Sequence, residues 1–171
     1  MKLQGKTAIV TGGGRDIGRA CALELAAQGA NVAINYHSSS EGADSAVAEI
    51  KAAGGNAFAL QGDMTSEADV KALVAKTVAE FGKVDNLMHV TGGIVARVPM
   101  HEMTLEHWNK VMTLNATSFM LAVRECLPHM GAGSSIVSMA SQAGRDGGGP
   151  GSGAYAASKG AVMTLTRGLA K

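Results

Sequence analysis

The 171-residue sequence has little cysteine, almost no net charge and no long apolar run, and each absence excludes a class of protein. Two cysteines, Cys21 and Cys126, are too few for a disulfide framework or a zinc site, so we expect two buried thiols in a reducing compartment. None of the five histidines stands at metal-ligand spacing from another, so no metal is expected. The net charge of +1, with both signs mixed along the chain, predicts no nucleic-acid or membrane-surface partner.

The apolar segments are short and the chain is of single-domain size. No stretch approaches the length that spans a bilayer, and the start MKLQGKTAIVTGGG lacks the apolar core of a signal peptide. Hydrophobic residues make up 46% of the chain and charged residues 17%, which is a globular balance. We therefore expect a soluble, cytoplasmic protein.

Short apolar runs alternate with longer helical patterns along the whole chain. The runs expected to form strands are residues 7–11, 31–36, 56–61, 84–90 and 135–139, and the expected helices are 17–28, 41–53, 66–81, 104–130 and 154–171. The alternation predicts right-handed βαβ units, hence an α/β fold with a parallel sheet covered by helices on both faces. At roughly 30 residues per unit, five strands fit one domain that spans residues 1–171.

The first strand leads into a glycine-rich turn, Thr11-Gly12-Gly13-Gly14-Arg15-Asp16-Ile17-Gly18, that opens a helix. Such glycines let backbone N–H groups approach a pyrophosphate at the positive end of the helix, although a simple turn stays open as an alternative. The spacing is not G-x-G-x-x-G, and Arg19-Ala20 exclude a nucleotide-triphosphate loop. Asp16 should repel a phosphate, so we expect its side chain to cap the helix, with Arg15 or Arg19 offsetting the charge.

A tyrosine and a lysine near the end of the chain suggest catalysis. Tyr155 and Lys159 are four residues apart, so on a helix both side chains project from one face. A lysine cation stabilises a phenolate, which makes the phenol a usable general acid and base. Ser141 follows the fifth strand, and Asn115 lies in the middle of a helix, a poor place for asparagine without a role. Each could be a turn or packing residue alone; together they point to a catalytic site.

With these residues in place, the sequence from Gly5 onward resembles the short-chain dehydrogenase/reductase family, of the classical, 3-oxoacyl-carrier-protein-reductase-like type. Residues 11–18 are similar to the family's T-G-x-x-x-G-x-G motif, and Asp63-Met64 to the pair that receives the adenine. The resemblance implies a Rossmann-like doubly wound sheet, with strand order 3-2-1-4-5, and an oxidoreductase that passes hydride between NADP(H) and a carbonyl or alcohol. The implied catalytic tetrad is Asn115, Ser141, Tyr155 and Lys159.

The resemblance also implies a role for each tetrad residue. Tyr155 would exchange a proton with the carbonyl or alcohol oxygen, and Ser141 would hydrogen-bond the same oxygen. Lys159 would hold the nicotinamide ribose, and Asn115 a water in a proton relay. The implied cofactor site comprises Gly12, Gly14, Arg15, Asp16, Ile17, Gly18, Asp63, Met64, Val90, Gly92, Tyr155 and Lys159.

The stretch after the second strand, Asn35-Tyr36-His37-Ser38, bears on which nicotinamide cofactor is preferred. It has no carboxylate to hydrogen-bond a ribose 2′-hydroxyl or repel a 2′-phosphate, and Arg15 lies across the turn. We therefore expect NADP(H) over NAD(H), and we expect an aspartate at position 35 or 36 to shift the preference toward NAD.

Three features depart from the family pattern. Asp16 replaces the central glycine of the first motif, and His89-Val90-Thr91-Gly92 stands where Asn-Asn-Ala-Gly is usual. His89 is expected to be a satisfied core histidine, with replacement of the missing asparagine hydrogen bond as the alternative. The family's sixth and seventh strands and their substrate-covering lobe are absent from this sequence, so a sheet with an exposed apolar edge is expected.

Partners and rival functions complete the expectations. Residues 94–101 and 147–153 should line the pocket for a small carbonyl or alcohol substrate, and helices 104–130 and 154–171 resemble the pair that forms the family's dimer or tetramer. One rival is a non-catalytic NAD(P)-binding protein or an inactive fragment of such an enzyme. The other is a methyltransferase-type domain, which also has a glycine-rich turn but has no use for the Tyr155 and Lys159 pair.

Overall fold

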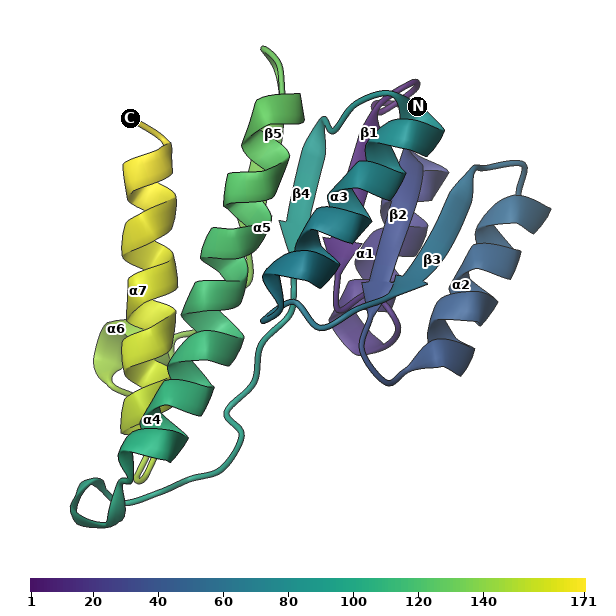
Figure 1. Cartoon of the computed structure of the whole chain (residues 1–171). Helices are drawn as coiled ribbons and strands as arrows, with labels where there is room; N and C mark the ends of the chain where they lie inside the picture. Colours follow the sequence, from purple (N-terminus) through teal and green to yellow (C-terminus); the bar gives the residue numbers. More distant parts are fainter.

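A five-stranded parallel sheet forms the centre of the computed structural model, which describes all residues from 1 to 171 (Figure 1). Its order is β3-β2-β1-β4-β5, and every neighbouring pair is parallel. The order and the doubly wound fold are as predicted, and the strand ends lie within two residues of expectation. The strands are β1 (Thr7–Thr11), β2 (Asn31–Tyr36), β3 (Ala57–Gln61), β4 (Asn86–His89) and β5 (Ser135–Ser138).

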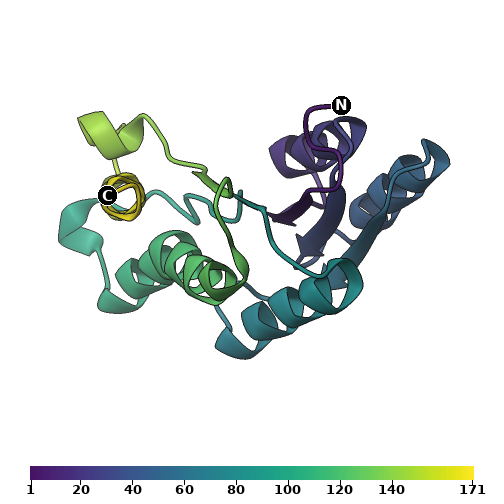
Figure 2. The same cartoon turned by 90° about the horizontal axis from the view of Figure 1, so that it is seen from above.

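Helices cover the sheet from two sides, with α1 (Asp16–Ala27) and α2 (Ser40–Ala52) on one face and α3 (Glu67–Phe81) and α5 (Ser118–Cys126) on the other (Figure 2). The alternation of side chains along a strand explains the two cores. Ala8 and Val10 of β1 belong to the apolar cluster under α1 and α2, whereas Ile9 belongs to the cluster under α3 and α5. Each inner strand is therefore apolar on both faces, as a buried parallel strand requires.

The long helix expected over residues 104–130 is present as one unbroken run of helical backbone from residue 105 to 129, but its hydrogen-bond pattern changes along the way. A 3₁₀ turn (Met100–Glu102) precedes α4 (Leu105–Met112), a π-helical turn (Thr113–Thr117) separates α4 from α5, and a second 3₁₀ turn (Leu127–His129) follows. The π turn holds Asn115, whose side chain is fully buried. The π turn is wider than an α-helical turn, but it is only five residues long, so hydrophobic periodicity did not reveal it; such turns are frequent at functional sites.

The last helix, α7 (Gly153–Leu169), lies beside α4 and α5 beyond the β5 edge of the sheet (Figure 1). A single helical turn, α6 (Ala143–Asp146), precedes it and was not predicted. Val162 of α7 joins the cluster under α3 and α5, which fixes the helix against the sheet. The direction of the crossovers reverses between β1 and β4, and the carboxyl ends of the strands at such a point form a ligand crevice.

The face of β4 and β5 on the α1 side carries an apolar groove of about 490 Å³. Its walls include Val137 and Ile17, whose exposed fractions of 50% and 54% are high for aliphatic side chains. An exposed apolar surface was expected at this edge of the sheet. No helix in the structure combines the length and the apolar character that crossing a membrane requires.

Candidate functional site

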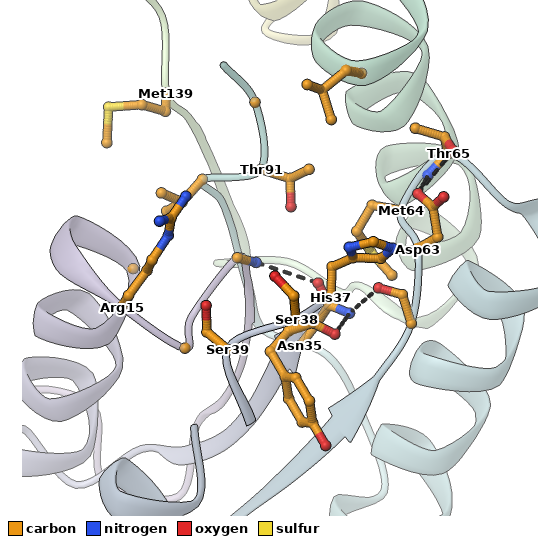
Figure 3. Close-up of a pocket in the computed structure, with 18 of the residues that line it drawn as sticks. Arg15, Asn35, His37, Ser38, Ser39, Asp63, Met64, Thr65, Thr91 and Met139 are labelled. Carbon is orange, nitrogen blue, oxygen red and sulfur yellow. Dashed lines mark hydrogen bonds between the residues drawn. The ribbon is translucent and has the colours of Figure 1, made fainter. Parts of the chain in front are cut away.

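A cavity of about 750 Å³ lies at the carboxyl ends of β1, β2 and β4, at the point where the crossovers reverse (Figure 3). Figure 3 shows Arg15 on one side and Asp63 on the other, with His37, Ser38 and Ser39 between them. All twelve residues expected to bind the cofactor lie along its walls: Gly12, Gly14, Arg15, Asp16, Ile17, Gly18, Asp63, Met64, Val90, Gly92, Tyr155 and Lys159. Their binding role stays a prediction, but the fold gathers them around one space.

The glycine-rich turn brings backbone N–H groups to the start of α1. Gly12 adopts φ +65°, and a side chain on Gly18 would collide with the Gly12 carbonyl, so both positions need glycine. The Gly13 amide donates to the Asn35 carbonyl at 2.8 Å, which anchors the turn to β2. The turn therefore leaves the positive end of α1 facing the cavity, where it can accept an anionic group.

Asp16 does not cap α1, which corrects the expectation from the sequence. Arg15 occupies the N-cap position without a side-chain cap, and Asp16 is the first helical residue, at φ +46°. The Asp16 side chain is 80% exposed, and its carboxylate lies 3.7 Å from Arg15 Nε. The left-handed backbone explains why glycine suits this position: L residues with a Cβ adopt that conformation only at an energetic cost, which is smallest for Asp and Asn.

Asn35 has a structural role that the sequence did not reveal. Its side chain is 2% exposed, and its amide donates to the Gly62 carbonyl at 2.9 Å and accepts from the Gly12 amide at 3.3 Å. Asn35 thus ties the turns after β1 and β3 to the end of β2. An aspartate at position 35 would break this bracket, so position 35 is unsuited to the cofactor switch expected there; His37 is exposed in the cavity instead.

Asp63 presents a carboxylate oxygen to the opposite end of the cavity. Its Oδ1 accepts from the amide and the hydroxyl of Thr65, both at 2.8 Å, while Oδ2 has no protein donor. Partial burial opposes ionisation, but the Thr65 hydrogen bonds and the positive potential of His37 outweigh it and hold the pKa of Asp63 below its usual value. Asp63 is therefore an anionic acceptor with a free oxygen, which suits an exocyclic amino group.

The Tyr155 and Lys159 side chains share one face of α7, as predicted. Lys159 Nζ lies 5.8 Å from the centre of the Tyr155 ring and donates to the Met139 carbonyl at 2.7 Å. Burial lowers the pKa of Lys159 to about 8, because only 3% of the residue is exposed. Met139, directly after β5, was not identified from the sequence; its role needs only a backbone carbonyl, which any residue type supplies.

Asn115 and Ser141 do not lie along the cavity wall, although both are close in sequence to residues that do. The Asn115 amide group donates to the carbonyls of Gly93 and Val111, both at 2.9 Å, and Asn115 Oδ1 accepts from the Gly93 amide at 3.0 Å. The Ser141 hydroxyl accepts from the Ala143 amide at 3.2 Å, where α6 begins. In this structure both side chains therefore bind the protein itself, and their catalytic roles stay predictions.

His89, at the end of β4, is a core histidine with a partner at each ring nitrogen. It is 2% exposed; Nδ1 lies 3.1 Å from Thr11 Oγ1, and Nε2 lies 3.2 Å from Ser118 Oγ. Burial, with the Lys159 charge as a smaller cause, lowers the pKa of His89 to about 3. The residue is thus neutral and fully hydrogen-bonded at neutral pH.

The two loops expected to line a substrate pocket contact one another. The Val98 amide donates to the Gly151 carbonyl at 2.9 Å, and Arg97 donates to the Pro150 carbonyl at 3.1 Å. Neither 94–101 nor 147–153 contributes to the cavity wall. The 750 Å³ cavity is thus separate from the surface that these two loops form.

Comparison with known proteins identifies the family to which this chain is similar. The family model described as short chain dehydrogenase matches residues 6–171. Hydroxynaphthalene reductase arp2 of Aspergillus fumigatus is 41% identical over 170 residues, which cover 99% of this chain and 62% of that protein. A short chain dehydrogenase from Burkholderia cenocepacia in complex with NADP is 38% identical, with a TM-score of 0.94, and the match covers 99% of this chain and 69% of that one.

A second solved structure is that of a reductase that depends on NADH. The NADH-dependent reductase A1-R′, responsible for alginate metabolism, is 32% identical with a TM-score of 0.91, and the match covers 97% of this chain and 70% of that one. The chain thus spans somewhat under two thirds of the length of the first curated relatives that it matches.

Proposed function

This chain belongs to the short chain dehydrogenase family, and from that premise we propose that it binds NADP(H) and serves hydride transfer between that cofactor and a small carbonyl or alcohol. The observation that carries the proposal is the single cavity at the carboxyl edge of the sheet, which joins the glycine-rich turn to Tyr155 and Lys159. A dinucleotide is elongated, and this cavity runs between two sites suited to its two ends.

The cofactor's polar groups have matching partners along the cavity. The start of α1 suits the pyrophosphate, because helix dipole and backbone N–H groups favour an anion there. The free Oδ2 of Asp63 suits the adenine amino group. Buried Lys159, within reach of Tyr155, suits the hydroxyls of the nicotinamide ribose.

A preference for the 2′-phosphorylated cofactor is supported by the charges after β2. Arg15, His37, Ser38 and Ser39 surround this part of the cavity (Figure 3). Residues 35–40, at and directly after the end of β2, include no carboxylate that would repel a phosphate. The relative from Burkholderia in complex with NADP agrees, whereas the NADH-dependent reductase of the same family means that likeness alone does not decide the cofactor.

The proposed chemistry divides between cofactor and protein. When bound, the nicotinamide supplies or accepts the hydride. The Tyr155 phenol gives its proton to the carbonyl oxygen during reduction and takes it back during oxidation, and the Lys159 cation stabilises the phenolate that remains. Ser141 would donate its hydroxyl proton to the same oxygen, because the hydrogen bond from the Ala143 amide uses only a lone pair of the hydroxyl and leaves that proton free.

One observation favours a second candidate, a cofactor-binding protein without turnover. The Asn115 amide protons both go to backbone carbonyls, and neither Asn115 nor Ser141 lies along the cavity wall, so two of the four expected catalytic residues do not line the cavity. The chain covers 62% of the length of hydroxynaphthalene reductase arp2. The activity of that longer protein is therefore a proposal for this chain.

Association between copies of the chain is part of the proposal. Leu105, Met120 and Leu127, on α4, α5 and the turn after them, are 73%, 39% and 47% exposed, which is high for apolar side chains. A homodimer or homotetramer that pairs these helices and α7 would cover them. Light scattering on the purified chain tests this: a dimer or larger species supports the pairing, and a monomer at micromolar concentration contradicts it.

Fluorescence titration of the purified chain with NADPH and with NADH tests cofactor binding and preference. We expect tighter binding of NADPH; tighter NADH binding would contradict the preference, and no binding of either would contradict the function. Turnover of a panel of small ketones by wild type and Tyr155→Phe then separates the two candidates. A rate that falls by about 10²-fold or more in the variant, with NADPH affinity unchanged, supports the enzyme. Cofactor binding without any turnover supports the second candidate.

A further inference from the structure

The hydrogen-bond partners of His89 fix which ring nitrogen carries the proton. Ser118 Oγ lies 2.6 Å from the Leu114 carbonyl, which can only accept, so the hydroxyl proton is committed to that carbonyl. Ser118 Oγ must then accept from His89 Nε2, which is 3.2 Å away. The ring is therefore the Nε2–H tautomer, and its Nδ1 is an acceptor.

The other side of the ring continues the chain of hydrogen bonds. Thr11 Oγ1, 3.1 Å from His89 Nδ1, donates its proton to that nitrogen. Its lone pairs accept from the backbone amides of Val90 and Thr91, at 3.2 and 3.3 Å. Every donor meets an acceptor, and only a neutral imidazole with its proton on Nε2 satisfies the whole series. A phenylalanine ring of similar shape would break it at two points.

The series joins two segments that border the candidate site. At one end are the amides of Val90 and Thr91, which lie along the cavity wall. At the other end is the Leu114 carbonyl, inside the π turn that also holds Asn115. From the same turn, the Asn115 side chain hydrogen-bonds to the backbone of Gly93. The segment after β4 is therefore held at one end by Thr11 and at the other by Asn115.

We propose that His89 is a positioning residue, which joins Thr11 to Ser118 and thereby holds residues 90–93 against the π turn in the geometry that cofactor binding needs. The hydrogen-bonded bridge stands on the structure alone, and its effect on the cofactor rests on the proposed function. Asparagine or glutamine can each restore one half of the bridge. In His89→Asn the new amide oxygen would take the position of Nδ1 and accept from Thr11, whereas in His89→Gln the longer side chain would bring its amide to Ser118.

The test compares His89→Phe, His89→Asn and His89→Gln with His129→Asn, a control at an exposed histidine outside the cavity wall. We expect amide hydrogen exchange at Val90 and Thr91 to accelerate in His89→Phe, and NADPH to bind about tenfold more weakly. His89→Asn should restore affinity to within about threefold and bind more tightly than His89→Gln, because it keeps the Thr11 contact beside the cavity. The control should match wild type.

A spectroscopic measurement needs no cofactor and no variant. Nitrogen NMR of the wild-type histidines should show a neutral His89 with its proton on Nε2 at pH 6. A proton on Nδ1 or on both nitrogens would overturn the bridge, as would wild-type exchange and affinity in a folded His89→Phe. If that variant does not fold, equal NADPH affinity of the His89→Asn and His89→Gln variants overturns the proposal. Failure of wild type to bind either cofactor refutes the proposed function and leaves the exchange and NMR tests in force.

Discussion

The side chain of Asn115 and the backbone of Gly93 form a closed pair of hydrogen bonds: Oδ1 accepts from the Gly93 amide at 3.0 Å, and Nδ2 donates to the Gly93 carbonyl at 2.9 Å. The second amide proton goes to the Val111 carbonyl in the same helical region. Asn115 is fully buried and Gly93 is half-buried, so removal of the side chain leaves the Val111 carbonyl without this buried partner. The pair therefore holds the segment after β4 to the π turn.

Asn115→Ala should destabilise the fold by about 2–4 kcal/mol, since it removes three hydrogen bonds at a fully buried side chain and leaves a small cavity. For a chain of this size that corresponds to a melting temperature lower by roughly 5–15 °C, measured by circular dichroism without cofactor. The exposed Asn109 on α4 gives a matched control, and Asn109→Ala should stay within about 0.5 kcal/mol of wild type. Equal melting temperatures for the two variants would contradict the structural role.

Gly92 has no room for a side chain, because a Cβ atom there would lie 2.6 Å from Asn115 Oδ1 and 3.0 Å from Lys159 Nζ. Gly92→Ala should therefore displace both groups and weaken NADPH binding by about tenfold or more. The neighbouring Gly93 meets nothing within 4 Å, so Gly93→Ala is the control and should change the affinity little. The comparison fails if both alanine variants bind NADPH as tightly as wild type.

The strands, most of the helices and the glycine-rich turn were predicted from the sequence because these patterns depend on local chemistry, whereas the strand order was predicted from the resemblance to a family. The residues that form the cavity come from the ends of strands, and the fold brings such ends to one edge. The features that sequence reasoning missed depend on contacts between segments far apart in the chain. The backbone angle of Asp16, the π turn at Asn115 and the engagement of Asn35 with two neighbouring turns are set by long-range contacts, which hydrophobic periodicity does not encode.

The exposed carboxylate of Asp16 stands beside the turn expected to hold a pyrophosphate, at a backbone angle that suits glycine. Asp16→Gly should tighten NADPH binding about three- to tenfold at low salt, because it removes a repelling charge and frees Arg15. Asp16→Asn keeps a residue tolerant of the left-handed angle, so it isolates the charge and should give most of the gain. The gain should shrink in roughly 0.5 M salt, where charges are screened; weaker binding in both variants would indicate that Asp16 helps the cofactor.

Arg15 and His37 should decide the choice between the two cofactors. Arg15→Gln should weaken NADPH by about tenfold and leave NADH nearly unchanged, since only NADPH carries the 2′-phosphate. His37→Asp places a carboxylate after β2 and should reverse the preference, measured as the ratio of the two dissociation constants. The exposed Lys51 at the end of α2 lies outside the cavity wall, so Lys51→Gln is a charge-matched control. An unchanged ratio in both variants would refute this assignment.

Lys159 should make the stability of the cofactor-free protein depend on pH in the alkaline range. Its folded-state pKa of about 8 lies below the ordinary value of 10.5, so between these values the unfolded chain binds more protons and the free energy of unfolding rises with pH. The burden of burying the charged ammonium is present below about pH 8, on the order of 3 kcal/mol, and disappears by about pH 10.5. Lys159→Met, which keeps the stem and removes the charge, should lack this rise, whereas exposed Lys110→Met should retain it. Urea denaturation of the three proteins from about pH 7 to about pH 10.5 measures the difference, and parallel profiles for wild type and Lys159→Met would show that the ammonium is solvated in the folded state.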